Sequence, residues 1–120
     1  MTITKILIVD DAATDRNNLK DIVTSAGYVA STASSGKEGM ELALKTKPDV
    51  ILLDILMQDM DGFELCRNLR ANEATKSTPI IMVSSKNQKA DRVWALEQGA
   101  TGYVPKPYTP KDIIDSIRRL

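Results

Sequence analysis

The sequence predicts an α/β fold, a three-layer α/β/α sandwich built on a five-stranded parallel sheet. Short aliphatic runs alternate with longer amphipathic stretches along the chain, and this alternation is typical of a parallel sheet with helices on both faces. Three of the aliphatic runs are continuous, as expected of strands that are buried on both faces. The chain has 120 residues, 42% of them hydrophobic, and we expect residues 1–120 to form one domain.

Five strands are predicted, three of them strong and two weaker. The strong strands are the aliphatic runs Ile6–Val9, Val50–Leu53 and Ile80–Val83. The weaker strands are Tyr28–Ala33 and Gly102–Val104. The small polar residues of the first weaker strand suit a position at the edge of the sheet, where one side of the strand has no neighbour.

Five helices are predicted between and after these strands, because apolar residues recur there at helical spacing. Gly27 and Gly99 stand where a helix C-cap favours glycine, and Pro110 stands at a natural first-turn position. The expected helices are Thr14–Ala26, Gly36–Lys47, Asp61–Ala71, Gln88–Gln98 and Pro110–Leu120.

The fourth expected helix carries the single tryptophan of the chain. Val93 and Leu96 suit its buried stripe, which leaves Trp94 at the flank, either at the edge of the core or in contact with a partner. Lys89 and Arg92, together with Tyr103 from the last strand, are expected on one exposed face, for which a solvated surface is the simplest interpretation.

Composition excludes several classes of protein. Sixteen basic and sixteen acidic residues give no net charge, so no overall basic field exists to bind nucleic acid or an anionic membrane. The absence of histidine excludes histidine-based triads and metal sites. The single cysteine, Cys66, excludes disulfides within the chain and cysteine zinc clusters, and its place on an apolar helix face indicates the core. No apolar run is long enough to span a membrane and no signal-peptide pattern is present, so we expect a cytoplasmic protein.

Polar residues follow four of the strands. Asp10 and Asp11 come after the first strand, Asp54 after the third, Ser84 and Ser85 after the fourth, and Lys106 follows the fifth after one proline. Parallel strands share one direction, so these side chains gather at one edge of the sheet, where open α/β sheets bind their ligands. A strand order of 2-1-3-4-5 puts the three aspartates side by side.

Three carboxylates in one crevice repel one another unless protons or a cation neutralise them. Oxygen ligands without histidine or cysteine indicate a hard cation, and we predict Mg²⁺. Asp54 is the best nucleophile for phosphoryl transfer, which would give an acyl phosphate. Lys106 and Ser84 would then neutralise the phosphoryl group and donate a hydrogen bond to it.

Simpler interpretations exist for several of these residues. Asp10 and Asp11, taken alone, fit the start of a helix as well as a site. Asp59 and Asp61 are better explained as loop and helix-start residues than as ligands, because Asp61 stands where an acidic N-cap is favoured. Ser85 is interpreted as structural or redundant.

Six motifs together resemble the response-regulator receiver domain of bacterial two-component signalling, and the resemblance covers the whole chain. Each motif alone is weak, but together they match in identity, order and spacing. The motifs are Ile6–Asp11, Val50–Asp54, Met60–Gly62, Val83–Ser85, Gly99–Ala100 and Tyr103–Pro107. Residues 85–100 are also similar to single-domain regulators of the chemosensory pathways that control type IV pili and twitching motility.

The resemblance implies a CheY-like, flavodoxin-like fold of strand order 2-1-3-4-5. It implies that Asp54 takes a phosphoryl group from a sensor histidine kinase, and that the Lys106–Pro107 peptide bond is cis. The face of the fourth helix, fifth strand and fifth helix would bind a downstream protein target. The implied residue roles are Mg²⁺ binding by Asp10, Asp11, Asp54 and the Leu56 carbonyl, contact of Lys106 with the phosphoryl group, and switching by Ser84 and Tyr103.

Two residues near Asp54 differ among members of the family and bear on its properties. Gln58 stands where the family often has proline, so the shape of that loop is open. Leu56 lies two residues after the acceptor, at a position that tunes water access in the family. An apolar side chain cannot orient water, so we expect slow to intermediate self-dephosphorylation.

Three other functions compete with a phosphorylation switch. A haloacid-dehalogenase-like phosphohydrolase also uses an aspartate at a strand end and Mg²⁺, but it needs an acid where this chain has Leu56. A flavodoxin-like binder of flavin mononucleotide would find its phosphate repelled by Asp10 and Asp11. A degenerate receiver that only binds partners is not favoured, because all key groups are present. A DNA-binding role would need a further domain.

Overall fold

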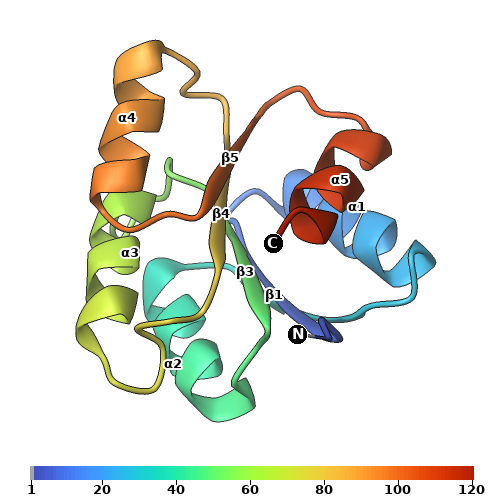
Figure 1. The fold of residues 1–120 in the computed structure, drawn as a ribbon, viewed down its shortest axis with the longest axis horizontal. Helices are drawn as coiled ribbons and strands as arrows, with labels where there is room; N and C mark the ends of the chain where they lie inside the picture. Colours follow the sequence, from blue (N-terminus) through green and yellow to red (C-terminus); the bar gives the residue numbers. More distant parts are fainter. Residues whose placement is uncertain (1) are drawn as a thin grey trace.

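A computed structural model describes residues 2–120 and contains the five-stranded parallel sheet that the sequence predicts. The strand order is β2-β1-β3-β4-β5, so β2 and β5 are the edges and β1, β3 and β4 lie inside (Figure 1). Adjacent strands are in register at their carboxyl ends, with Val9 of β1 beside Leu53 of β3. The strands are β1 Lys5–Val9, β2 Val29–Ala33, β3 Val50–Leu53, β4 Ile80–Ser84 and β5 Gly102–Pro105.

Five helices cover the two faces of the sheet, as predicted. Helices α1 and α5 pack on one face, and α2, α3 and α4 pack on the other (Figure 1). The helices are α1 Ala13–Ser25, α2 Gly36–Thr46, α3 Gly62–Ala71, α4 Lys89–Glu97 and α5 Pro110–Arg118. No helix within residues 2–120 is long and apolar enough to cross a membrane.

The core forms two layers because successive strand residues point to opposite faces. In β1, Leu7 and Val9 pack into the layer under α2, α3 and α4, whereas Ile6 and Ile8 pack into the layer under α1 and α5. Every residue of β3 is buried, which explains why its run is uniformly aliphatic. This packing fixes the direction and the register of the strands whose ends carry the polar residues.

Local signals end and begin the helices where expected. Gly27 and Gly99 follow α1 and α4 with φ of 95° and 103°, a conformation that glycine adopts without steric cost. The Asp61 side chain accepts a hydrogen bond from the Glu64 backbone N–H at 2.9 Å and caps α3. The prediction that Asp61 is a helix-start residue is therefore confirmed.

Two sequence-based expectations were wrong in detail. Ser84 and Pro105 lie inside β4 and β5 rather than after them. In α4, Val93 and Leu96 are 46% and 56% exposed, and Ala95 is the residue buried against the sheet. The physical reason is that α4 contacts the core through a narrow stripe, so its larger apolar side chains stay outside.

Trp94 lies beside Phe63 at the N-terminal end of α3. The ring centroids are 6.5 Å apart and the planes meet at 75°, an edge-to-face arrangement. Trp94 is nevertheless 47% exposed, so it packs at the edge of the core and also faces solvent.

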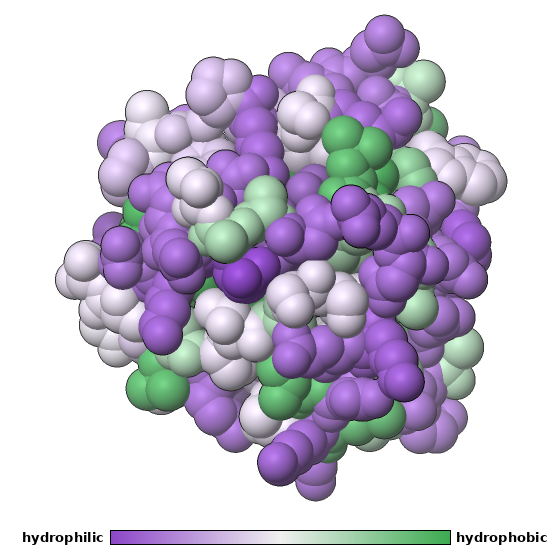
Figure 2. All heavy atoms as spheres, turned by 180° about the vertical axis from the view of Figure 1, so that it is seen from behind, coloured by the Kyte–Doolittle hydropathy of each residue, from purple (hydrophilic) through white to green (hydrophobic). Residues whose placement is uncertain are grey.

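The surface opposite to the view of Figure 1 is mostly hydrophilic. Figure 2 shows that hydrophobic residues occur there in small, separate groups. Scattered apolar residues are normal on a folded surface, and this face carries no extended apolar patch that would mark a large interface.

Candidate functional site

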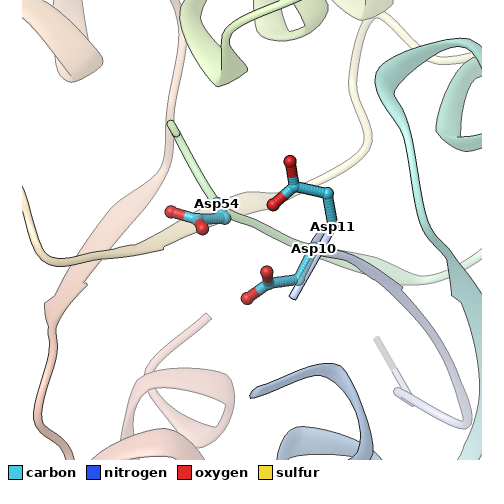
Figure 3. A group of neighbouring side chains, drawn as sticks. All are labelled: Asp10, Asp11 and Asp54. Carbon is cyan, nitrogen blue, oxygen red and sulfur yellow. The ribbon is translucent and has the colours of Figure 1, made fainter. Parts of the chain in front are cut away.

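The carboxyl ends of β1 and β3 bring three aspartates together. Asp10 and Asp11 follow β1 directly and Asp54 follows β3, and the two strands are hydrogen-bonded neighbours. One carboxylate oxygen from each of the three lies within 4.8 Å of the others. Figure 3 shows the three side chains grouped at these strand ends. The predicted carboxylate crevice is therefore present.

The three carboxylates differ in their exposure to water. Asp10 is 1% exposed and Asp54 is 6% exposed, whereas Asp11 is more open to solvent. Burial raises the pKa of Asp10 above its ordinary value, and the nearby Asp54 charge adds to this effect. The crevice therefore concentrates negative charge that favours binding of a cation.

Lys106 balances this charge from the loop after β5. Its Nζ lies 3.0 Å from an Asp10 oxygen, 3.0 Å from an Asp15 oxygen and 3.4 Å from an Asp54 oxygen. Burial lowers the pKa of Lys106, but its hydrogen bonds to Asp15 and Asp10 outweigh burial and raise this pKa above the ordinary value. The lysine is therefore a fixed positive charge at the centre of the site.

Backbone N–H groups orient each carboxylate of the crevice. The N–H of Ala12 donates to Asp10 at 2.9 Å, and the N–H of Leu56 donates to Asp54 at 3.3 Å. The N–H of Gln58 donates to Asp11 at 3.1 Å. The loops after β1 and β3 thus hold the acidic side chains in place.

Two contacts at this site were not predicted from the sequence. Asp15 in the first turn of α1 reaches Lys106, and the Arg16 guanidinium donates to the Asp10 carbonyl at 2.9 Å. The contact of Asp15 joins it to a residue far along the chain, so no local pattern in the sequence could have found it. The Lys106–Pro107 bond is cis, as the resemblance implied.

Ser84 and Tyr103 lie beside the crevice on neighbouring strands. Ser84 is fully buried, and its Oγ accepts a hydrogen bond from the Lys86 N–H at 3.3 Å. The buried Tyr103 hydroxyl has no hydrogen-bond partner within residues 2–120. The Arg92 guanidinium stacks 5.8 Å above the Tyr103 ring centroid. Burial raises the pKa of the Tyr103 phenol, with a further contribution from Asp91.

Other predicted residues lie outside the crevice. Asp59 accepts hydrogen bonds from the N–H groups of Gly36 and Lys37 at 2.9 Å each, so it is a loop residue that holds the start of α2. Ser85 is exposed. Cys66 is buried in the core, as predicted, and its thiol donates to the Gln98 carbonyl oxygen.

Comparison with known proteins identifies one family. A sequence model of the response regulator receiver domain matches residues 6–118. PilH of Pseudomonas aeruginosa is 37% identical over 113 residues, which cover 94% of this chain and 93% of PilH. The probable transcriptional regulator ycf27 of Guillardia theta is 41% identical over 114 residues, which cover 95% of this chain but 44% of ycf27. The chain thus spans less than half of that relative.

Solved structures agree with this comparison. The chemotaxis protein CheY4 of Vibrio cholerae, crystallized at low pH, superimposes with a TM-score of 0.93 and 32% identity, covering 98% of both chains. The BeF3-activated N-terminal receiver domain of RstA from Klebsiella pneumoniae gives a TM-score of 0.89 and 27% identity, covering 97% of both chains. The likeness extends over nearly the whole of each structure.

Proposed function

This chain belongs to the response regulator receiver domain family of two-component signalling, and we propose that Asp54 is the residue on which it accepts a phosphoryl group from a sensor histidine kinase. The observation that carries this assignment is the position of Asp54 at the end of β3, with two further carboxylates within 4.8 Å and the Lys106 ammonium 3.4 Å away. Asp10 also lies near two carboxylates and Lys106, but Asp54 stands alone at the end of β3 and faces the Asp10–Asp11 pair that follows β1.

The proposed step is an in-line displacement at phosphorus. An Asp54 oxygen forms a bond to the phosphorus of the kinase phosphohistidine while the P–N bond breaks. The imidazole leaves with the bonding electrons and takes up a proton. Lys106 then contacts the phosphoryl oxygens and balances part of their charge.

Receiver domains bind Mg²⁺ through acidic residues, and the donor set of this chain fits that ion. We propose that Asp10, Asp11, Asp54 and the Leu56 carbonyl hold it, because oxygen donors without histidine or cysteine are the ligands that Mg²⁺ prefers. A bound Mg²⁺ would supply charge neutralisation for the carboxylates and for the incoming phosphoryl oxygens.

We propose that Ser84 and Tyr103 convert phosphorylation into a change of surface. The Ser84 oxygen accepts a hydrogen bond in this structure, so its own proton is available for a phosphoryl oxygen. The Tyr103 hydroxyl is buried without a partner within residues 2–120, and an unsatisfied buried hydroxyl costs free energy. The Tyr103 side chain would therefore lose no hydrogen bond by moving to another conformation. The proposed output surface is the face of α4, β5 and α5.

The role in the cell is proposed from the same findings. The domain acts as a signalling phospho-acceptor that catalyses only its own phosphorylation and slow dephosphorylation. Residues 1–120 are proposed to form this single receiver domain. The resemblance of residues 85–100 to single-domain regulators of type IV pili favours a chemosensory pathway of that kind. A downstream protein is the proposed target, without direct binding to nucleic acid or membrane. The single free cysteine fits a cytoplasmic, reducing location.

Intact-mass spectrometry after incubation with acetyl phosphate and Mg²⁺ tests the proposal. We expect the wild-type chain to gain one phosphoryl group, and we expect the gain to disappear in Asp54→Asn and after removal of Mg²⁺. Phosphorylation of Asp54→Asn to the wild-type level would contradict the assignment. If acetyl phosphate fails as a donor, a phosphorylated histidine kinase is the second donor, and failure of both contradicts phospho-acceptance.

A further inference from the structure

Asp15 contacts the lysine of the site but lies outside the group of three aspartates. It stands in the first turn of α1, and its Oδ2 is 3.0 Å from Lys106 Nζ. This distance equals the one to Asp10 and is shorter than the 3.4 Å to Asp54. Asp15 is 42% exposed, so its carboxylate faces solvent as well as the site.

The carboxylates of Asp10, Asp15 and Asp54 compete for the ammonium group of Lys106. A lysine ammonium has three N–H donors, and Asp10, Asp15 and Asp54 occupy all of them. Asp10 is buried and has a second donor in the Ala12 N–H. The Asp15 carboxylate has no other hydrogen-bond donor within the described part of the chain. Its contact with Lys106 is therefore the one that can yield when a phosphoryl group arrives.

The same carboxylate also lines the open cleft beside Lys106. That cleft is formed by Asp15, Asn18, Ser85, Lys106, Pro107 and Tyr108. A phosphoryl donor that approaches Lys106 through this cleft meets the negative charge of Asp15. Coulomb repulsion grows with the charge of the donor, so the cleft disfavours strongly anionic donors.

We propose that Asp15 is a positioning residue that occupies one of the three N–H donors of Lys106 and selects against dianionic phosphoryl donors. This inference rests on the proposed role of Asp54. Removal of the Asp15 charge weakens its hold on one N–H of Lys106, which the phosphoryl group can then take, and weakens the repulsion at the cleft. Both effects speed phosphorylation, and the second depends on the charge of the donor.

Two small donors of different charge separate these effects. Acetyl phosphate is a dianion near neutral pH, and its transfer to Asp54 releases acetate as the P–O bond breaks. Phosphoramidate is chiefly a monoanion, and its transfer releases ammonia as the P–N bond breaks and the nitrogen takes up a proton. The second-order rate constant for each donor is measured by intact-mass time courses at saturating Mg²⁺.

The comparison uses the wild type and three variants, Asp15→Asn, Asp15→Glu and Asp21→Asn. Asp21 is the matched control, because it is exposed on the same helix and its side chain has no ion pair within residues 2–120. We expect Asp15→Asn to raise the rate constant for acetyl phosphate about five- to tenfold, and the one for phosphoramidate only about twofold. Asp15→Glu restores the wild-type preference, and Asp21→Asn leaves both rates unchanged.

Several results would overturn the inference. Equal rates for the wild type and Asp15→Asn, with a wild type that is phosphorylated on Asp54, would reject it and leave the proposed function intact. Equal acceleration for both donors, or the same acceleration in Asp21→Asn, would reject the selective role of Asp15. A wild type that accepts no phosphoryl group from any donor would remove the proposed function and this inference together. Urea unfolding of each variant checks that the fold is retained.

Discussion

Gln58 contributes to the site through its backbone rather than its side chain. Its N–H donates to Asp11 at 3.1 Å, and proline, which the family often has at this position, has no N–H to donate. The sequence departure that left the shape of this loop open therefore adds a hydrogen bond to a carboxylate proposed to bind Mg²⁺.

Replacement of Gln58 tests this contact. We expect Gln58→Pro to weaken Mg²⁺ binding by a few-fold, up to about tenfold, because a carboxylate that loses its outer hydrogen bond is less well oriented for a metal. Isothermal titration calorimetry measures the affinity. Gln58→Ala keeps the backbone N–H and is the control. Equal affinities for the two variants would show that the hydrogen bond has no influence.

Leu56 is predicted to set the lifetime of the acyl phosphate. Its side chain is 50% exposed beside Asp54 and cannot orient water. We expect Leu56→Asn to shorten the lifetime about fivefold, which corresponds to one new hydrogen bond of about 1 kcal/mol to the attacking water. Decay of the phosphorylated mass after removal of the donor measures it. Leu56→Met, which stays apolar, should decay like the wild type, and an unchanged lifetime in Leu56→Asn would refute the prediction.

At the residue scale, the sequence predicted the groups that follow strands and missed those that depend on helix orientation. Asp10 and Asp54 could be predicted because a buried run ends directly before each of them. The contact between Asp15 and Lys106 joins residues 91 positions apart. It depends on the rotation and tilt of α1 against the loop after β5, and no local pattern encodes either.

At the scale of elements, helix α3 begins directly against the backbone of Asp54. The Gly62 N–H donates to the Ile55 carbonyl at 2.8 Å. A Cβ atom at Gly62 would collide with the Asp54 carbonyl oxygen and would lie 2.8 Å from the Ile55 Cα. Backbone atoms cannot move aside as a flexible side chain can, so the close approach of α3 requires glycine.

Substitution of this glycine should disturb both the fold and the site. We expect Gly62→Ala to lower the free energy of unfolding by about 1–3 kcal/mol, the usual cost of forcing atoms into a filled space. Gly102→Ala is the control, because its nearest neighbour would be at an ordinary 3.7 Å, and its effect should stay within about 0.5 kcal/mol. Urea denaturation measures both, and equal effects would contradict the steric argument.

Asp59 links the loop before α3 to the start of α2, because its carboxylate accepts hydrogen bonds from the first N–H groups of α2. Hydrogen bonds from the Gly36 and Lys37 N–H groups hold the pKa of Asp59 below its ordinary value. A carboxylate with a lowered pKa in the folded state stabilises the fold above its unfolded pKa of about 3.9, and this contribution is lost as the pH falls through the folded pKa.

The stability of Asp59→Ala should therefore depend on pH in a defined way. We expect this variant to be about 1 kcal/mol less stable than the wild type at neutral pH, as for the loss of a helix cap. The difference should stay constant down to about pH 4 and shrink below it. Urea unfolding between pH 3 and pH 7 measures it, with Asp21→Ala as a control. If the stability difference between Asp59→Ala and the wild type grew as the pH fell, the prediction would be contradicted.

At the scale of the whole molecule, the fold was the most predictable property. Continuous aliphatic runs identified the inner strands, and the small polar residues of β2 placed that strand at an edge. Helix ends differed from the expectation by one or two residues, because terminal turns have few contacts. The stripe of α4 was predicted wrongly, since a helix that touches the sheet chiefly through Ala95 leaves little trace in its periodicity.

The proposed cation should also stabilise the whole fold. Binding to the folded state alone raises the free energy of unfolding, by about 2.7 kcal/mol at a concentration one hundred times the dissociation constant. We expect Mg²⁺ to raise the urea midpoint of the wild type and to have a much smaller effect on Asp11→Asn. Chelator-treated protein is the reference. Identical midpoints with and without Mg²⁺ would contradict a metal site at these aspartates.

The contact between Phe63 and Trp94 has an optical consequence. Trp94 is the one tryptophan of the chain, so emission excited at the red edge of the absorption band comes from a single place on α4. Its indole touches Phe63 at the N-terminal end of α3, and Trp94 is 47% exposed, so both the packing of the ring and its solvation shape the spectrum. The domain therefore carries an intrinsic fluorophore that senses the spacing of α3 and α4 without any label.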